Sequence, residues 1–183
     1  MPKETYIPCL LQLFRQHGYD GATLAKISEA TGLGKASLYH HFPGGKDEMV
    51  EAVLGYLETW LDRYILQALA SPGNASERLG QMCDRLYELY EGGHQPCIFA
   101  ILLLGSAREV FHPKIKVLFF AWIDAIAKVL IETGMDEVLA QQRAEDVAIA
   151  IQGSLILAQG LEDPSPFQRV IKQLPQDLCR DAS

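Results

Sequence analysis

The stretch Thr23–Lys46, T-L-A-K-I-S-E-A-T-G-L-G-K-A-S-L-Y-H-H-F-P-G-G-K, decides the fold that this chain is predicted to adopt. Its first part has apolar side chains at helical spacing, Leu24, Ile27 and Ala30. Gly32 interrupts that pattern, and Lys35–Phe42 then begins a second short helix, which Pro43-Gly44-Gly45 ends. Two short helices joined by a glycine-bearing turn form a helix-turn-helix.

The second of these helices has residue types suited to a DNA groove. Lys35 suits a guanine edge or a phosphate, and Ala36 suits a thymine methyl group. Tyr39 and His40 follow one turn later, where they can donate hydrogen bonds to phosphate oxygens. Lys46 starts the next helix, so its charge adds to the positive end of that helix's dipole. The predicted DNA-binding residues are Thr23, Lys35, Ala36, Ser37, Tyr39, His40 and Lys46.

Each of these residues, taken singly, is more often part of an ordinary exposed helix face. The spaced set behind a helix-turn-helix glycine favours DNA binding. For Thr23, a helix cap and a phosphate contact stay equally open. For Lys26, a solvated side chain and a phosphate contact stay equally open.

The run from Gly32 to Met49, G-L-G-K-A-S-L-Y-H-H-F-P-G-G-K-D-E-M, resembles the recognition region of the TetR family of transcriptional regulators. Residues 32–57 resemble its branch of LmrA- and YxaF-like multidrug-resistance regulators. The motif resemblance covers residues 5–57, and elsewhere it rests on length and helix pattern. It implies an all-helical homodimer with a DNA-binding head and a body that binds a small molecule. Ser28 departs from the Ala that often occupies its position.

The charge is unevenly divided along the chain. Residues 1–46 contain five Lys/Arg and three Asp/Glu, a net charge of +2, although the whole chain of 183 residues has a net charge of −7. The head is therefore the least acidic part. Its modest charge indicates that DNA binding would depend on a few placed contacts rather than on a broad positive field.

Helical periodicity continues to the end of the chain and predicts an all-α fold of about nine helices. The head is assigned to residues 1–46 and the ligand-binding and dimerisation body to residues 47–183. Pro113 is expected to open a helix, because the first helical turn tolerates a missing N–H. The expected helices are Lys3–Gln16, Thr23–Thr31, Lys35–Phe42, Asp47–Ala70, Ser76–Glu91, Cys97–Leu104, Pro113–Leu130, Gln141–Leu161 and a short closing helix at 165–174.

The helix expected at 141–161 has apolar residues on two sides and therefore needs two partners. Val147, Ile151 and Leu155 mark one side, and Ile149 and Ile156 mark the other. Together with the closing helix at 165–174, this surplus predicts a homodimer interface, since two-fold contacts are the commonest kind.

Aromatic and Met side chains concentrate in the body. Each of them is usually a core residue, but a flexible apolar pocket would use the same residue types. Polar contacts to a ligand from Arg108, Glu109 or His112 are less favoured than solvated loop charges. The predicted effector-binding residues are Met82, Tyr87, Tyr90, Phe99, Phe119, Trp122 and Ile126.

Catalytic and metal signatures are missing from the sequence. Gly44-Gly45-Lys46-Asp47 lacks the first glycine and the Ser/Thr of a phosphate-binding loop, and the five histidines show no ligand spacing. No metal or cofactor is expected. Cys97 falls near a helix start, which would favour a reactive thiolate; a buried apolar thiol is the favoured alternative.

These observations predict a cytoplasmic, non-enzymatic, homodimeric regulator that binds double-stranded DNA at a palindromic operator and responds to a small apolar effector. The longest apolar run, Cys97–Leu104, is too short to cross a membrane. Two other classes stay open: a helical ligand carrier whose head no longer binds DNA, and an enzyme with an unfamiliar helical site.

Overall fold

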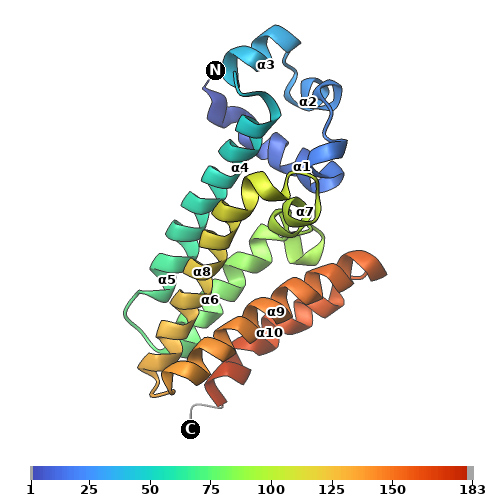
Figure 1. The fold of residues 1–183 in the computed structure, drawn as a ribbon. Helices are drawn as coiled ribbons and strands as arrows, with labels where there is room; N and C mark the ends of the chain where they lie inside the picture. The colour runs from blue at the N-terminus through green and yellow to red at the C-terminus, as the bar shows by residue number, and fades with distance from the viewer. Residues whose placement is uncertain (1, 181–183) are drawn as a thin grey trace. The chain divides into compact units, whose positions relative to one another are not determined.

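The computed structural model describes residues 2–180, and that part of the chain is built from helices and contains no strand (Figure 1). The all-α prediction is confirmed. The described residues form two compact units. The first contains the chain up to Thr59 together with Ile98–Lys116, and the second contains Trp60–Cys97 together with the chain from Val117 onward. The predicted DNA-binding segment 1–46 lies within the first unit, but the functional division at residue 46 stays a prediction.

The first unit is a helical head to which a later segment of the chain, Ile98–Lys116, adds α7 and the start of α8. In it, α1 packs against both α2 and α7. Its core is closed by fully buried large side chains, including Phe14, Leu38 and Phe42. An ion pair of 3.2 Å between Lys114 and Glu58 joins the beginning of α8 to α4. Its elements are η1 (Lys3–Tyr6), α1 (Ile7–Gly21), α2 (Leu24–Thr31), α3 (Lys35–His41), α4 (Gly45–Leu61, up to Thr59), α7 (Ile98–Leu104) and the start of α8 (Arg108–Glu132).

The break in α1 lies at Gly18, two residues after the expected end of the first helix at Gln16. Gly18 has φ +65° and ψ −176°, a conformation that is accessible almost only to glycine. The regular helical conformation is therefore interrupted between His17 and Tyr19. Of the expected helix Cys97–Leu104, residues Ile98–Leu104 form α7, and Cys97 lies just before it.

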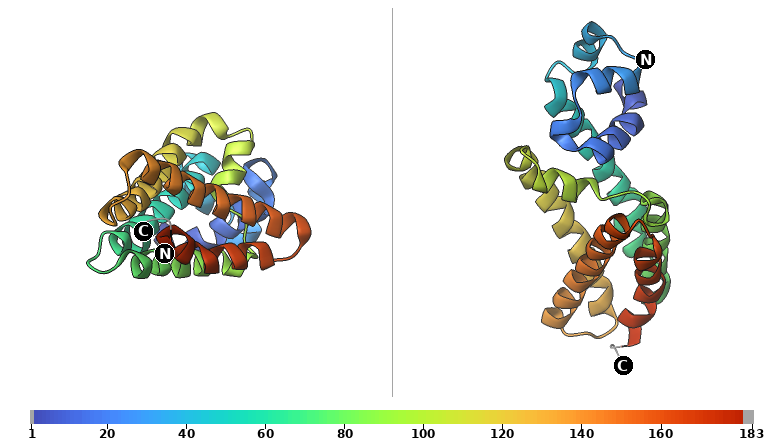
Figure 2. Two further views of the ribbon diagram at one scale, coloured as in Figure 1. Left: turned by 90° about the horizontal axis from the view of Figure 1, so that it is seen from below. Right: turned by 90° about the vertical axis from the view of Figure 1, so that its right-hand side faces the viewer.

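In the second unit, α10 packs along α9 and also against α6. Figures 1 and 2 show α9 and α10 side by side from different directions. Apolar side chains from these helices are buried among themselves, for example Leu79, Ile151 and Phe167. Its elements are the end of α4, the π-helix η2 (Asp62–Leu66), α5 (Gln67–Leu69), α6 (Ala75–Leu89), η3 (Glu91–Gly93), the rest of α8, α9 (Glu137–Leu161) and α10 (Ser165–Arg180).

Three predicted helix starts are wrong. α9 begins at Glu137 behind the cap Asp136, four residues before the predicted start at Gln141. The cap of α6 is Asn74, whose side-chain oxygen accepts a hydrogen bond of 2.8 Å from the Glu77 N–H, so Ser76 lies inside the helix. Pro113 likewise lies inside α8, which begins at Arg108. The earlier start is stabilised because Phe111 is fully buried and its N–H bonds to the Ala107 carbonyl at 3.2 Å.

Candidate nucleic-acid interface

The first helix of the helix-turn-helix begins with a side-chain cap. Thr23 is exposed and has extended backbone angles, and its hydroxyl accepts a hydrogen bond of 3.4 Å from the Lys26 N–H. This is the capping geometry that threonine adopts at helix starts. The structure thus gives Thr23 a local role, and its contact with phosphate stays a prediction.

The turn between α2 and α3 is held by glycine and by two hydroxyl groups. Gly32 adopts the left-handed conformation at φ +69° and ψ 9°, which favours glycine. The Ser28 hydroxyl donates to the Leu33 carbonyl across the turn. The Thr31 hydroxyl donates to the Ile27 carbonyl at 2.7 Å and accepts from the Leu33 N–H at 3.3 Å. Ser28, the departure from the usual Ala, therefore stabilises the turn directly.

The helix α3 separates a buried side from a polar, exposed side. Leu38 is 1% exposed and anchors α3, and Phe42 closes its C-terminal end. Tyr39 is 42% exposed, which leaves its phenol accessible on the outer side. All five predicted residues on this helix are exposed: Lys35, Ala36, Ser37, Tyr39 and His40. The neighbouring His41 lies partly buried with its ring centroid 5.3 Å from that of Tyr6.

Lys46 is held inside the head more firmly than its position in the sequence indicates. Its ammonium group donates a hydrogen bond of 2.7 Å to the Tyr19 carbonyl. The same nitrogen lies 4.1 Å from the centroid of the Tyr19 ring, a cation–π distance. An ammonium group has three donors, so these contacts fix its place without using all of its hydrogen bonds.

The two acidic residues after Lys46 are also engaged within the head. Asp47 accepts a hydrogen bond from the Tyr19 phenol, and this bond is the main reason why the pKa of Tyr19 rises to about 12. Glu48 accepts from the Gly44 N–H at 2.9 Å and pairs with Lys3 at 3.6 Å. These partners reduce the repulsion that free carboxylates beside Lys46 would exert on DNA phosphate.

Sequence reasoning missed the part played by Tyr19, which lies outside the helix-turn-helix stretch. Its partners Lys46 and Asp47 are more than 25 residues away in the chain. No periodic pattern or short motif connects positions so far apart. Only the Gly18 break indicated that the chain changes direction here.

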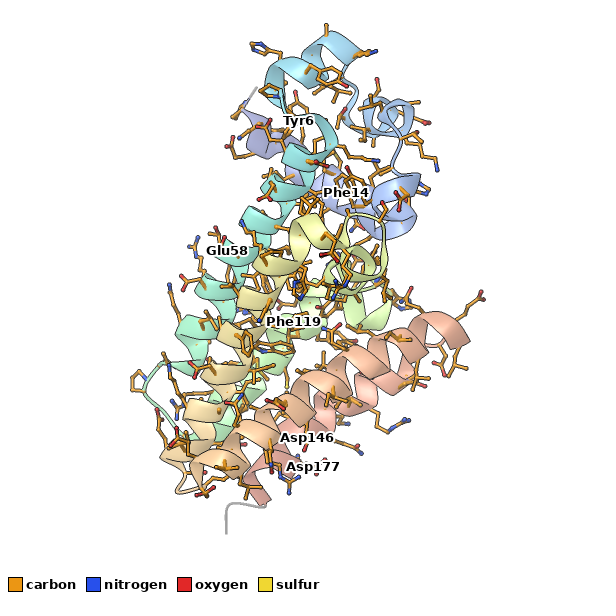
Figure 3. The ribbon with its side chains drawn as sticks, viewed as in Figure 1. Tyr6, Phe14, Glu58, Phe119, Asp146 and Asp177 are labelled. Carbon is orange, nitrogen blue, oxygen red and sulfur yellow. The ribbon has the colours of Figure 1, made fainter. Side chains whose placement is uncertain are left out.

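The predicted effector residues fall into several environments. Trp122 and Met82 are buried in the second unit, where the indole N–H donates to the Met82 sulfur at 3.3 Å. Tyr90 and Tyr87 both flank the buried ring of Phe167, and Tyr87 is 43% exposed. Phe119, which is labelled in Figure 3, is half-buried on α8. The fully buried Ile126 lies on α8 with Trp122, whereas Phe99 lies on α7 in the first unit.

Two hollows in the second unit are lined by other residues. One of about 230 Å³ lies between α9 and α10, where Asp146 and Asp177 lie close together (Figure 3). The other, of about 190 Å³, lies beside His94 and Glu162. Neither includes a predicted effector residue, so the effector set stays a prediction. Cys97 is 4% exposed and its sulfur accepts from the Tyr90 phenol at 3.5 Å, which favours the buried-thiol interpretation.

One face of α9 is apolar and exposed. Ile149 is 68% exposed and Ile156 is 63% exposed. Gly153 and Gly160 lie on the same face, and a Cβ built at either would meet no atom within 4 Å. The apolar residues of α10 differ, because Phe167, Ile171 and Leu174 are buried within the protomer.

No helix among residues 2–180 is long and apolar enough to cross a membrane. Among the described side chains, those of residues 2–178, no group of three or more His, Cys, Asp or Glu is arranged to hold a metal ion.

Comparison with known proteins places this geometry in a family. Residues 10–53 match the model of bacterial regulatory proteins of the tetR family, and residues 75–173 match the LmrA/YxaF-like transcriptional regulator C-terminal domain. The Bacillus subtilis transcriptional regulator LmrA is 25% identical over 97% of each chain. YxaF from the same organism is 23% identical over 94% of this chain and 93% of its own.

Solved structures agree on the fold. A TetR transcriptional regulator from Legionella pneumophila superposes with a TM-score of 0.80, at 20% identity and 94% coverage of both chains. A TetR regulatory protein from Rhodobacter sphaeroides gives a TM-score of 0.78, at 20% identity, covering 94% of this chain and 96% of its own. With its helix-turn-helix surface and both of its family domains matched, the chain belongs to the TetR family of DNA-binding transcriptional regulators, in the LmrA/YxaF-like branch.

Proposed function

We propose that this protein is a cytoplasmic repressor of transport or detoxification genes that a small apolar or aromatic effector releases from its operator. TetR-family regulators bind DNA operators as dimers. The observation that carries the proposal is the composition of the exposed side of α3. Lys35 and Tyr39 lie there with small residues between them, while Leu38 anchors the helix from behind.

In this proposal α3 enters the major groove. Lys35 reads a base edge or a phosphate, Ala36 and Ser37 allow close approach of the backbone, and Tyr39 and His40 donate to phosphates. A dimer presents two such helices to a roughly palindromic operator with half-sites about one helical turn apart or somewhat more.

The dimer is proposed to form through α9 and the adjoining α10. The exposed face of α9 supports this, since isoleucines alternate with glycines that allow close approach of a second copy. α10 would contribute polar contacts at the edge, because its apolar residues are already buried in the protomer.

The effector is proposed to be apolar because Trp122, Met82 and Ile126 offer an apolar environment with a polarizable sulfur. Release requires only that the effector bind more tightly to a conformer whose two heads no longer match the operator spacing. Thermal shift against a panel of planar and aliphatic compounds tests this. A stabilising compound should also quench Trp122 fluorescence in a variant with Trp60→Phe, and an unchanged spectrum would exclude the proposed pocket.

Fluorescence anisotropy with DNA from the promoter of the protein's own gene, at two salt concentrations, tests the DNA-binding assignment. Tyr39→Ala should weaken binding at least about 10-fold, because each of the two heads in the dimer loses a hydrogen bond to a charged phosphate. Tyr56→Ala is a matched control, because Tyr56 is 43% exposed and lies on α4 outside the proposed interface. Equal affinities for the two variants would contradict the role of Tyr39.

A further inference from the structure

We propose that Asp20 and Ser106 are positioning residues for DNA binding, because their contact fixes the corner that precedes the helix-turn-helix to the beginning of α8. The inference rests on the proposed function and assigns part of its regulation. Neither residue lies on the exposed side of α3, and both act through the helices that they hold.

The contact between them engages both oxygens of one carboxylate. The Ser106 hydroxyl donates to Oδ1 of Asp20 at 2.5 Å, and the Ser106 N–H donates to Oδ2 at 3.4 Å. The hydroxyl bond is the main reason why the pKa of Asp20 is lowered. Asp20 is therefore ionised at neutral pH, and the hydrogen bonds are of the stronger, charge-assisted kind. They join positions 86 residues apart in sequence, both within the first unit.

Tyr19, the neighbour of Asp20, is held from two further directions. Its ring lies 6.0 Å from that of Phe111, which is fully buried in the first turn of α8. Its phenol donates to Asp47 and its carbonyl accepts from Lys46, both at the start of α4. The corner clasp, which we define as Tyr19, Asp20, Lys46, Asp47, Ser106 and Phe111, thus joins α4, α8 and the end of α1.

The clasp lies immediately before α2. Ala22 is fully buried and its N–H bonds to the Gly18 carbonyl at 3.3 Å, so few backbone rotations separate the corner from the first residue of α2. A change in the direction of the corner must therefore change the direction of α2 and of the turn that follows it.

α8 connects the clasp to the proposed effector residues. It runs as one helix from Arg108 to Glu132 and includes Phe111 near its start and Trp122 eleven residues later. A ligand bound beside Trp122 would therefore contact the same helix that begins at the clasp.

The chain contains a matched control for the contact. Ser165 donates to Asp163 through the same two groups, its hydroxyl at 2.7 Å and its N–H at 2.9 Å. The pKa of Asp163 is also lowered, here chiefly by the backbone bond from Ser165. These residues are two positions apart at the start of α10, so their contact joins no separate elements. Ser165→Ala removes the equivalent hydroxyl hydrogen bond to an aspartate without affecting the corner.

The experiment compares Ser106→Ala, Ser165→Ala and Ser106→Thr in the full-length protein. Binding to promoter DNA and to scrambled DNA is measured by anisotropy, and melting temperature is measured in parallel. Ser106→Ala should weaken promoter binding about 3-fold to 10-fold, the range for one hydrogen bond, with scrambled-DNA binding unchanged and a melting temperature that stays well above the assay temperature. Ser165→Ala should match the wild type, and Ser106→Thr should restore binding because it keeps the hydroxyl. A purely local role would leave the ratio of promoter to scrambled affinity unchanged.

Hydrogen exchange without DNA separates this inference from the proposed function. Amides of residues 19–23 should exchange faster in Ser106→Ala than in the wild type, and no faster in Ser165→Ala. Equal exchange in all three proteins, or wild-type DNA selectivity in Ser106→Ala, overturns the inference. If the wild type itself shows no DNA selectivity, the proposed function fails, and the exchange rates still decide whether the contact positions the corner.

Discussion

Replacing both Ile149 and Ile156 with Asp should separate the proposed dimer. These two exposed isoleucine side chains lie on one face of α9, with Gly153 between them. A self-complementary two-fold contact repeats each residue, so the double substitution places four carboxylates in one interface.

The magnitude follows from their exposure. Burying an isoleucine side chain completely stabilises by about 1.5–3 kcal/mol. Since Ile149 is 68% exposed and Ile156 is 63% exposed in the protomer, roughly two-thirds of that stabilisation is left for the dimer. Each residue then contributes about 1–2 kcal/mol, and the four copies contribute about 4–8 kcal/mol. The dimer dissociation constant should therefore rise at least about 1,000-fold, at 1.4 kcal/mol per factor of ten.

Sedimentation velocity over a concentration series measures this constant, and circular dichroism checks that the helices remain. Val117→Asp is a suitable control, because Val117 is a β-branched apolar residue that is 62% exposed on α8. The control should remain dimeric and bind promoter DNA. The double variant should be monomeric and bind it much more weakly. A double variant that dimerises as tightly as the wild type would show that α9 is not the interface.

Two further predictions concern single contacts. Glu132→Ala should destabilise the protein by about 1–3 kcal/mol in urea unfolding, because it removes the charged partner of the buried Arg78 guanidinium. The control Glu88→Ala breaks an exposed ion pair with Arg85 and should cost about 1 kcal/mol or less. Equal losses would show that burial of Arg78 does not matter. The hydrogen bond to Asp47 raises the pKa of Tyr19 from 10.0 to about 12. The contribution of this hydrogen bond to the free energy of unfolding should therefore be complete below pH 10 and disappear as the pH rises through 12. Titration of tyrosinate absorbance should show a late step that Tyr19→Phe removes, and an identical curve for that variant would contradict the assignment.

The helix-turn-helix could be predicted from the sequence because its determinants are local. The Thr23 cap, the left-handed Gly32 and the anchor Leu38 lie within a few residues of the structures that they specify. Helical period and glycine conformation act over one or two turns, so a single sequence contains them. The exposed side of α3 and the apolar surplus on α9 follow from the same short-range patterns.

Contacts between distant segments could not be predicted in this way. Pro113 was expected to open α8, but the helix begins at Arg108, and the fully buried Phe111 lies in the turn before the proline. Lys46 was expected to project toward phosphate, and the Tyr19 carbonyl and ring hold its ammonium group.

The sequence by itself determined a helical DNA-binding head and an amphipathic body, since periodicity and turn chemistry are properties of neighbouring residues. Only the tertiary structure decided that Asp20 meets Ser106, 86 positions away. Such a pairing depends on which helices pack together, and hydrophobic burial drives that packing without leaving a local pattern at the polar residues that it brings into contact.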